Sequence, residues 1–393
     1  MVFLRAGKLP GAQTPQGRGA QGRPDERGQP LGVRVAIVGT RGIPANYGGF
    51  ETFAEELSTR LAARGHHVTV YCRQRHSAPR YRGVDLVTLP TVRHKYFDTV
   101  VHTFFSTVHL MAHRQDAALY CNAANAIFTW APRLAGVPVA LNVDGLERNR
   151  KKWNWAGRLW YQLGERLSTV CPNAVVSDAE RIAEYYRARY GKETTFIPYG
   201  ADGGRVETSA VLDRLGLERG KYFLYVSRME PENNALLVRE AFERVSTTMK
   251  LALVGDAPYA ADYIARVRAT SDPRVVLPGA IYGEGYRELT SNSFAYIHAT
   301  EVGGTHPALI ESMARGALTL YLNTPENAEV AEGAALAFEP DTLAATMERA
   351  LAMGGPEREA YRAKAAARVS ERYSWDAVTL AYEKLLGGLA GSA

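Results

Sequence analysis

Residues 33–72 read VRVAIVGTRGIPANYGGFETFAEELSTRLAARGHHVTVYC, and this stretch decides the fold. An apolar, β-branched strand, an amphipathic helix ending at Gly65 and a second apolar strand follow one another. Glycine frees backbone amides, and a helix N-terminus beside them favours an anion. The stretch therefore predicts a strand–loop–helix–strand unit with an anion site in its loop. The glycines of that loop are Gly39, Gly42, Gly48 and Gly49.

The same alternation of strands and helices continues through the chain, with a junction near residues 197–204. With 393 residues, the chain is too long for one hydrophobic core. Alternation at this spacing indicates parallel sheets with right-handed crossovers. We therefore predict an α/β protein of two doubly wound Rossmann-like domains facing a cleft. Ligands of such sheets bind beyond the carboxyl ends of the strands, so we expect the site in the cleft.

The N-terminus differs from the rest in composition. Residues 1–32 hold seven Gly, four Pro and five Lys or Arg, without apolar periodicity. Such a segment buries too little surface to offset its ordering entropy. The predicted parts are a disordered tail at 1–32, an N-terminal domain at 33–198, a C-terminal domain at 199–375 and a helix at 376–393 that packs back toward the N-terminal domain.

Composition sets limits on function. The net charge is +6, and the tail supplies half of it, so the folded part is nearly balanced. The three cysteines (Cys72, Cys121, Cys171) lie far apart, which implies neither a disulfide framework nor a zinc site and favours a reducing cytosol. We find no signal-peptide core and no run of 18 apolar residues, and we expect a cytoplasmic protein without a membrane span.

The glycine-rich loop is not a dinucleotide fingerprint, because its spacing is not GxGxxG and no acidic residue closes the second strand. Residues 39–73 instead resemble the N-terminal signature of a branch of the retaining family 4 glycosyltransferases of GT-B fold. That branch includes bacterial rhamnosyltransferases of surface-polysaccharide assembly. The resemblance continues in order through NVDGLE, RMEPENN, VGDAPY, YGEGYRELTSNSFAYIHATEVGGTHPALIE and TPEN.

The resemblance implies a transferase. It would move a sugar, rhamnose being one candidate, from a nucleoside-diphosphate donor to a glycan or polyprenyl-linked acceptor, with retention. The donor would lie mainly on the C-terminal domain and the acceptor on the N-terminal one. No metal cluster or other cofactor is expected, since helix N-termini and an arginine can stabilise the leaving diphosphate. The leaving phosphate takes the acceptor proton in such a front-face mechanism, so no general base is required.

In the N-terminal domain, the resemblance places Gly48 and Gly49 near the donor diphosphate, with Tyr47 and Phe50 shaping the adjacent pocket. Asp144, in NVDGLE, ends a strand and should face the cleft, where it would orient the acceptor or contact the donor sugar. An Asx turn with the following glycine is the structural alternative for this aspartate.

In the C-terminal domain, Arg228 follows a strand at its carboxyl end, where a guanidinium can grip a phosphate. Related enzymes carry a lysine five residues later, and this chain has Asn233 there. Gly255 belongs to the matching VGDAPY segment. Tyr282 would lie beside the nucleobase. His298 ends a strand at the cleft, and we expect a structural role for it.

A second glycine-rich loop precedes a helix at residues 301–316. Pro307 suits the first helical turn, with Thr305 or His306 as the cap. The amides of Gly304, Thr305 and His306 would face the donor phosphates.

The acidic residues of this second loop depart from the family pattern. The resemblance assigns Glu311 to the donor ribose. The first glutamate of the family pattern falls on Gly303, so either a bulge delivers Glu301 or the backbone of Gly303 and Gly304 contacts the sugar. Asp144, Glu301 and Glu311 are the catalytic candidates.

Residues 147–167 combine six basic residues, three Trp and one Tyr with two acidic residues. This composition suits the inner face of a membrane, where a lipid-linked acceptor would lie, but also nucleic acid or an ordinary helix with solvated basic side chains. A nucleotide-sugar-binding pseudoenzyme and a nucleotide-sugar epimerase of the same fold remain alternative functions. Nucleic acid is the weakest partner, because the folded part carries little net charge.

Overall fold

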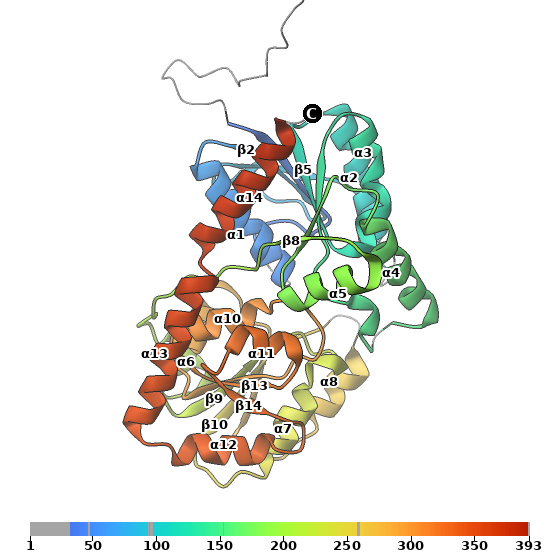
Figure 1. Cartoon of the computed structure of the whole chain (residues 1–393). Helices are drawn as coiled ribbons and strands as arrows, with labels where there is room; N and C mark the ends of the chain where they lie inside the picture. The colour runs from blue at the N-terminus through green and yellow to red at the C-terminus, as the bar shows by residue number, and fades with distance from the viewer. Residues whose placement is uncertain are drawn as a thin grey trace, which may run out of the picture. The chain divides into compact units, whose positions relative to one another are not determined.

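The computed structural model describes residues 32–45, 48–92, 94, 97–151, 153–257 and 260–391 (Figure 1). Statements on structure below concern these residues. The predicted tail, apart from Gly32, and Tyr47 lie outside them. None of the described helices is both long and apolar enough to cross a membrane.

The N-terminal half is built on one sheet. Its strands are β1 (Arg34–Val38), β2 (His67–Cys72), β3 (Arg80–Tyr81), β4 (Val84–Thr88), β5 (Ala117–Cys121), β6 (Val139–Asn142), β7 (Ala174–Ser177) and β8 (Thr195–Phe196). Within the described residues they lie in the order β3-β4-β2-β1-β5-β6-β7-β8, and all neighbours are parallel except β3 and β4. The helices and 3₁₀ turns between them are α1 (Gly49–Ala63), α2 (Asp98–Ala112), η1 (Ala123–Phe128), α3 (Trp130–Leu134), η2 (Glu147–Asn149), α4 (Trp155–Ser168) and α5 (Glu180–Tyr190).

The C-terminal half repeats the design on a wholly parallel sheet. Its strands are β9 (Tyr222–Val226), β10 (Lys250–Val254), β11 (Val275–Gly279), β12 (Ala295–His298), β13 (Leu318–Leu322) and β14 (Leu336–Phe338), in the order β11-β10-β9-β12-β13-β14. Its helices and 3₁₀ turn are α6 (Ala210–Leu215), η3 (Pro231–Asn233), α7 (Ala235–Glu243), α8 (Ala261–Arg268), α9 (Gly283–Asn292), α10 (Pro307–Ala314), α11 (Pro325–Ala331), α12 (Leu343–Ala352) and α13 (Gly355–Arg372). The predicted two-domain α/β fold with parallel sheets is confirmed.

The last helix, α14 (Trp375–Ala390), packs against α1 and β5 of the N-terminal half (Figure 1). Phe53 of α1 is central to this contact, because its ring lies 5.2 Å from Tyr199, 5.4 Å from Tyr382 and 6.4 Å from Trp375. Aromatic pairs at such distances add stability beyond the area they bury. The C-terminal end of the chain therefore completes the core beneath the first glycine-rich loop.

From the sequence, Ser177 or Asp178 is expected to cap the helix α5, since both are preferred N-cap residues, but this expectation is wrong. Neither Ser177 nor Asp178 caps α5, whose N-cap is Ala179 without a side-chain bond. The Glu329 carboxylate, from α11, accepts the first two amides of α5 at 2.8 and 3.1 Å. The Asp178 side chain is turned into the protein, where it accepts a bond from the second glycine-rich loop. A tertiary contact has replaced the local cap.

The buried Tyr382 hydroxyl accepts a hydrogen bond from Asn142 Nδ2 at 2.9 Å, which joins α14 to the end of β6. Tyr382→Phe should lower the free energy of unfolding by about 1–2 kcal/mol, because it leaves a buried amide donor without a partner. Urea unfolding followed by circular dichroism measures this change. Leu380→Ala, at an exposed position of the same helix, is the control and should change stability by less than about 0.5 kcal/mol. Equal stability of Tyr382→Phe and wild type would contradict the assigned role.

Candidate functional site

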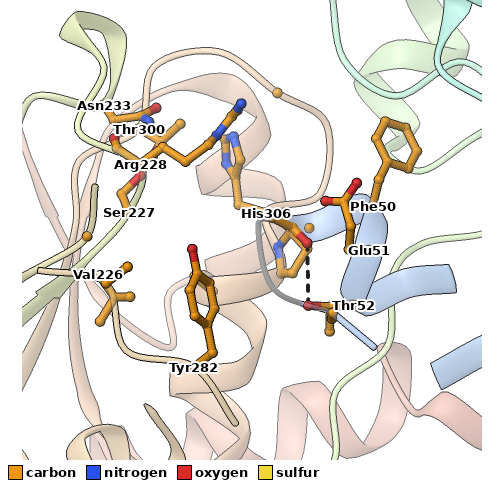
Figure 2. Close-up of a pocket in the computed structure, with 18 of the residues that line it drawn as sticks. Phe50, Glu51, Thr52, Val226, Ser227, Arg228, Asn233, Tyr282, Thr300 and His306 are labelled. Carbon is orange, nitrogen blue, oxygen red and sulfur yellow. Dashed lines mark hydrogen bonds between the residues drawn. The ribbon is translucent and has the colours of Figure 1, made fainter. Parts of the chain in front are cut away.

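A cleft of about 1080 Å³ lies at the carboxyl ends of both sheets (Figure 2). Residues that directly follow strands line it from each half, for example Gly39 after β1, Ser227 after β9 and Gly255 after β10. This is where the alternating fold concentrates loops and helix N-termini. Among the predicted residues, the lining includes Gly48, Gly49, Phe50, Asp144, Arg228, Asn233, Gly255, Tyr282, His298, Gly303, Thr305, His306 and Glu311.

The first glycine-rich loop brings two helix N-termini together. Gly48 is the N-cap of α1, and a Cβ added at Gly49 would lie 3.0 Å from Pro307 Cγ at the start of α10. The buried Glu51 carboxylate accepts the amide of Arg41 at 2.9 Å and so holds the loop against its helix. Figure 2 shows Phe50 and Glu51 on α1 across the cleft from the C-terminal half.

Arg228 stands on the opposite wall, just beyond β9, and its side chain is about a quarter exposed. Asn233 is buried, and its Nδ2 donates to the Arg228 carbonyl at 2.7 Å. Its amide therefore shapes the loop that carries the arginine. No residue larger than glycine fits at position 255, because the Cβ of any other residue would lie 1.8 Å from the Ser227 carbonyl oxygen.

Arg150 is a cleft residue that the sequence analysis did not single out. It comes from the N-terminal half, is 5% exposed, and lies close enough to Arg228 for their charges to repel. Its Nε bonds Glu147, and its Nη1 lies 3.7 Å from Glu232 of the C-terminal half without a hydrogen-bond partner among the described residues. The two arginines thus reach the cleft from opposite halves. The lysine that related enzymes carry is replaced here by Asn233. This replacement is the sequence signal that points to a second cation elsewhere in the chain.

The second glycine-rich loop binds the other half of the protein. The Thr305 amide donates to Asp178 Oδ2 at 3.0 Å, and the Thr305 hydroxyl donates to the Asp178 carbonyl. The prediction that the Thr305 amide faces donor phosphates is therefore wrong, because this amide is already bonded to Asp178. Gly304 does not line the cleft, because it packs on the same aspartate: a Cβ there would lie 2.0 Å from Asp178 Oδ1.

The N-cap of α10 is His306, without a side-chain bond to the helix, and Pro307 occupies the first helical position as expected. The His306 ring lies under Gly303, where a Cβ would be 2.1 Å from Nε2. Its Nδ1 bonds Asn327 Oδ1 at 2.8 Å. Burial lowers the pKa of His306 to about 4 and that of neighbouring His298 well below its usual value. Both imidazoles are neutral near pH 7, which suits a structural role.

The two glutamates of the second loop are placed differently. Glu311 lies one turn into α10 and lines the cleft, and burial raises the pKa of its carboxyl. Glu301 does not line the cleft. Its carboxylate pairs with Lys151 at 2.8 Å and accepts from Asn234 Nδ2 at 3.0 Å. The loop therefore does not deliver Glu301 to the site, and of the two glycines considered in its place only Gly303 borders the cleft.

Asp144 lines the cleft with a left-handed backbone, at φ +58°. The Asp144 amide donates to Asn142 Oδ1 at 3.0 Å. The Asp144 carboxyl also bonds the Gly145 backbone, so an Asx turn with Gly145 remains the structural alternative for this aspartate. Burial, together with the charge of Glu147, raises the pKa of Asp144 to about 6, against the opposing effect of Arg150. This carboxyl on the wall of the cleft therefore stays protonated to a higher pH than that of an ordinary aspartate.

Beside Asp144, the backbones of the two halves are in direct contact. A Cβ added at Gly145 would lie 2.2 Å from the Gly303 carbonyl carbon, so only glycine fits on the N-terminal side. Tyr282, half exposed, borders the cleft at the start of α9. Within the described ranges, no group of three His, Cys, Asp or Glu side chains is arranged to hold a metal ion.

Comparison with known families divides the chain as the sheets do. Residues 33–202 match the family described as Domain of unknown function (DUF1972), and residues 220–353 match the family described as Glycosyl transferases group 1. No curated protein sequence matches the chain.

Solved structures with the same fold cover nearly the whole chain. Sucrose-phosphate synthase (tll1590) from Thermosynechococcus elongatus has a TM-score of 0.76 at 18% identity, over 92% of this chain and 100% of its own. Anabaena Alr3699/HepE in complex with UDP-glucose has a TM-score of 0.73 at 15% identity, over 92% and 100%. WaaG, described as a glycosyltransferase involved in lipopolysaccharide biosynthesis, has a TM-score of 0.68 at 17% identity, over 90% and 100%. The two-domain α/β fold is that of these GT-B glycosyltransferases.

The buried Asp178 makes the stability dependent on pH. Burial, together with the charge of Asp144, raises the Asp178 pKa well above its unfolded value of about 4. A carboxyl with a raised folded pKa contributes stability below its unfolded pKa and loses it as the pH rises through the folded pKa. Asp178→Asn can still accept the hydrogen bond from the Thr305 amide. Its melting temperature should equal that of wild type at about pH 4 and exceed it at about pH 8.

Thermal melts at the two pH values measure this difference for Asp178. Asp341→Asn, at an exposed position, is the matched control and should follow wild type at both. A wild-type melting temperature that stays parallel to that of Asp178→Asn across the range would contradict the raised pKa.

Proposed function

We propose that the protein is a glycosyltransferase that uses a nucleoside-diphosphate sugar, because residues 220–353 match the family described as Glycosyl transferases group 1. The observation that carries the proposal is the convergence of Arg150 and Arg228, from opposite halves, on a cleft at the carboxyl ends of two parallel sheets. Guanidinium groups match phosphate oxygens in geometry as well as charge. A fold neighbour, HepE, was solved with UDP-glucose, which supports a donor of this class.

The donor is held mainly by the C-terminal half. In our proposal Arg228 and Arg150 bind the diphosphate, with Gly48 and Gly49 presenting the N-terminal end of α1 to it. Glu311 binds the ribose hydroxyls and Tyr282 borders the base.

The two arginines and the helix N-termini stabilise the charge that develops on the leaving diphosphate, so the reaction proceeds without a metal ion. The transfer retains the anomeric configuration through a front-face path.

The acceptor side is formed by the N-terminal half. Asp144, whose pKa lies near neutral, is placed to orient the acceptor hydroxyl. The acceptor is a glycan or a polyprenyl-linked sugar, and the transferred sugar is rhamnose, for use in surface-polysaccharide synthesis. The sequence signature of residues 39–73 supports this choice. We place the enzyme in the cytoplasm, at the inner face of the membrane.

A pseudoenzyme that binds the donor without transferring it is the second candidate. The placement of Glu301 favours it, because the ion pair with Lys151 keeps this carboxylate out of the cleft. Slow release of free sugar from a bound donor, detected by chromatography, separates the two. A transferase hydrolyses its donor without an acceptor at a measurable rate, and a pseudoenzyme does not.

Donor binding is tested by thermal shift with UDP, dTDP, GDP and ADP. One diphosphate at 100 times its dissociation constant should add about 2.7 kcal/mol of stability. Glu311→Ala should lose most of the shift, because the ribose contacts are removed. Glu348→Ala, at an exposed position of α12, is the control and should keep the shift. No shift for any diphosphate with the folded wild type would refute the donor site.

Arg150 gives a second prediction. Arg150→Lys should weaken binding of the preferred diphosphate by about tenfold or more, since a charged hydrogen bond contributes about 1.5–3 kcal/mol. Binding of the matching nucleoside, which lacks phosphates, should be unchanged in isothermal titration calorimetry. Arg244→Lys, the same change at an exposed end of α7, is the matched control and should leave binding of the diphosphate unchanged. If Arg150→Lys weakened the binding of the nucleoside as much as that of the diphosphate, Arg150 would only hold the two halves together.

A further inference from the structure

Exposed apolar side chains are concentrated on one part of the N-terminal half. Among the described residues, thirteen large apolar side chains are exposed, and ten of them lie between Phe97 and Val170. From residue 199 to residue 375 the only one in the described ranges is Tyr282, which borders the cleft. Scattered exposed apolar residues are normal, but a gathering on one surface marks an interaction site.

Each of three helices contributes a stripe with helical spacing. On α4 the exposed residues are Trp155, at 79% of its surface, and then Leu159 and Leu163 at successive i+4 positions. On α3 they are Trp130 and Leu134, again four residues apart. Residues at this spacing lie above one another on one face of a helix.

The third stripe, on α2, comprises Phe104, Phe105 and Val108. The Phe104 ring lies 6.4 Å from that of Phe128, the last residue of η1, two positions before the start of α3.

The stripes border one another. At the far end of α3, Arg133 donates to the Val170 carbonyl just beyond α4 at 2.9 Å. Figure 1 shows α2, α3 and α4 together on one side of the N-terminal sheet. The exposed apolar residues of α2, α3 and α4 therefore form one surface, called the α2–α4 face below.

The charge of this face is one-sided. Residues 98–171, from the start of α2 to just beyond α4, hold eight Lys or Arg against five Asp or Glu. Three of these five acids are turned into the cleft or into the protein: Asp144 and Glu147 line the cleft, and Glu165 lies on the buried side of α4 and accepts hydrogen bonds from two tyrosines. The remaining two are paired, Asp98 with Arg73 at 2.9 Å and Asp116 with Arg34 at 2.7 Å.

Of the eight basic residues, Arg150 lies in the cleft, and Arg148 and Lys151 pair with Glu165 and Glu301. Exposed arginines remain beside the apolar stripes: Arg114 after α2, Arg133 on α3, and Arg158 and Arg166 on α4. An apolar surface bordered by cations and lacking exposed anions complements an anionic bilayer.

We propose that the α2–α4 face docks on the surface of a membrane that contains anionic phospholipid. The aromatic and leucine side chains enter the interface and the arginines contact lipid phosphates. The N-terminal end of α2 and the loop before α4 also line the cleft, through Thr99 and Trp153. Docking would therefore bring the mouth of the cleft to the lipid. That the bilayer presents a lipid-borne acceptor to this mouth rests on the proposed function; the docking itself does not.

Sedimentation with vesicles tests the proposal on the full chain. Vesicles of phosphatidylcholine with phosphatidylglycerol should bind the protein, and those of phosphatidylcholine alone should bind it at least about tenfold more weakly. Molar salt should weaken the binding to the anionic vesicles. No binding to the anionic vesicles, or equal binding to both kinds, would overturn the proposal.

A matched pair of leucines sharpens the test, since Leu159 on α4 and Leu380 on α14 are 57% and 56% exposed. Leu159→Ser should weaken vesicle binding by about tenfold, whereas Leu380→Ser should leave it unchanged. Equal effects of the two changes would overturn the assignment to the α2–α4 face. So would a wild-type dimer, seen by analytical ultracentrifugation, that Leu159→Ser dissociates, because the occupant would then be a second copy.

The diphosphate thermal shift of Leu159→Ser separates this proposal from the proposed function. The shift should equal that of wild type, because Leu159 does not line the cleft. A protein that binds vesicles but no diphosphate would keep the docking surface and lose the transferase. A protein that binds a diphosphate but no vesicles would keep the proposed transferase and lose the docking surface.

Discussion

The hydrogen bonds between Asp178 and Thr305 are the contact on which the rest of the cleft depends. They join the end of β7 in one half to the loop before α10 in the other, and both residues are buried. Two further constraints meet at the same place, because Gly145 touches the backbone of Gly303 and Gly304 rests on Asp178. With these contacts made, the N-terminus of α10 is fixed opposite that of α1. The glycines of the second loop therefore serve the approach of the two halves as much as the binding of a ligand.

Closure of this kind poses an electrostatic problem for a cleft that takes an anion. Several carboxyl groups lie in or beside it, and a diphosphate adds negative charge. Burial raises the pKa of Asp144, Asp178 and Glu311, because the charged form of each carboxyl is less well solvated in the cleft than in water. The two arginines supply positive charge from opposite halves. In our proposal they act together only when the halves are closed, which makes diphosphate binding and closure depend on each other.

The sequence predicted the two parallel sheets and the position of the cleft because both follow from local patterns. Strand–helix alternation determines the sheet type, and glycine-rich loops after strands indicate the carboxyl edge. It failed where a tertiary contact replaced a local one, as at α5, whose cap is Glu329 rather than Asp178. It also missed Arg150, because a basic run beside tryptophans reads as a surface and only the fold turns this side chain inward. The short elements η1 and α3 carry too few residues to show a period.

The unequal distribution of exposed apolar residues gives the two halves different tasks. In the described C-terminal half, the exposed large apolar side chain borders the cleft, whereas the N-terminal half carries the α2–α4 face. A soluble donor needs no such face, and the half that we assign to it has none. An acceptor attached to a lipid does need one, since its sugar reaches the cleft only if the protein lies against the bilayer. The bond between Asn142 and Tyr382, and the packing of α14 on α1, then matter for function. They tie the end of the chain, which leaves the C-terminal half, to the half that would dock, so the two halves are joined here as well as at Asp178 and Thr305.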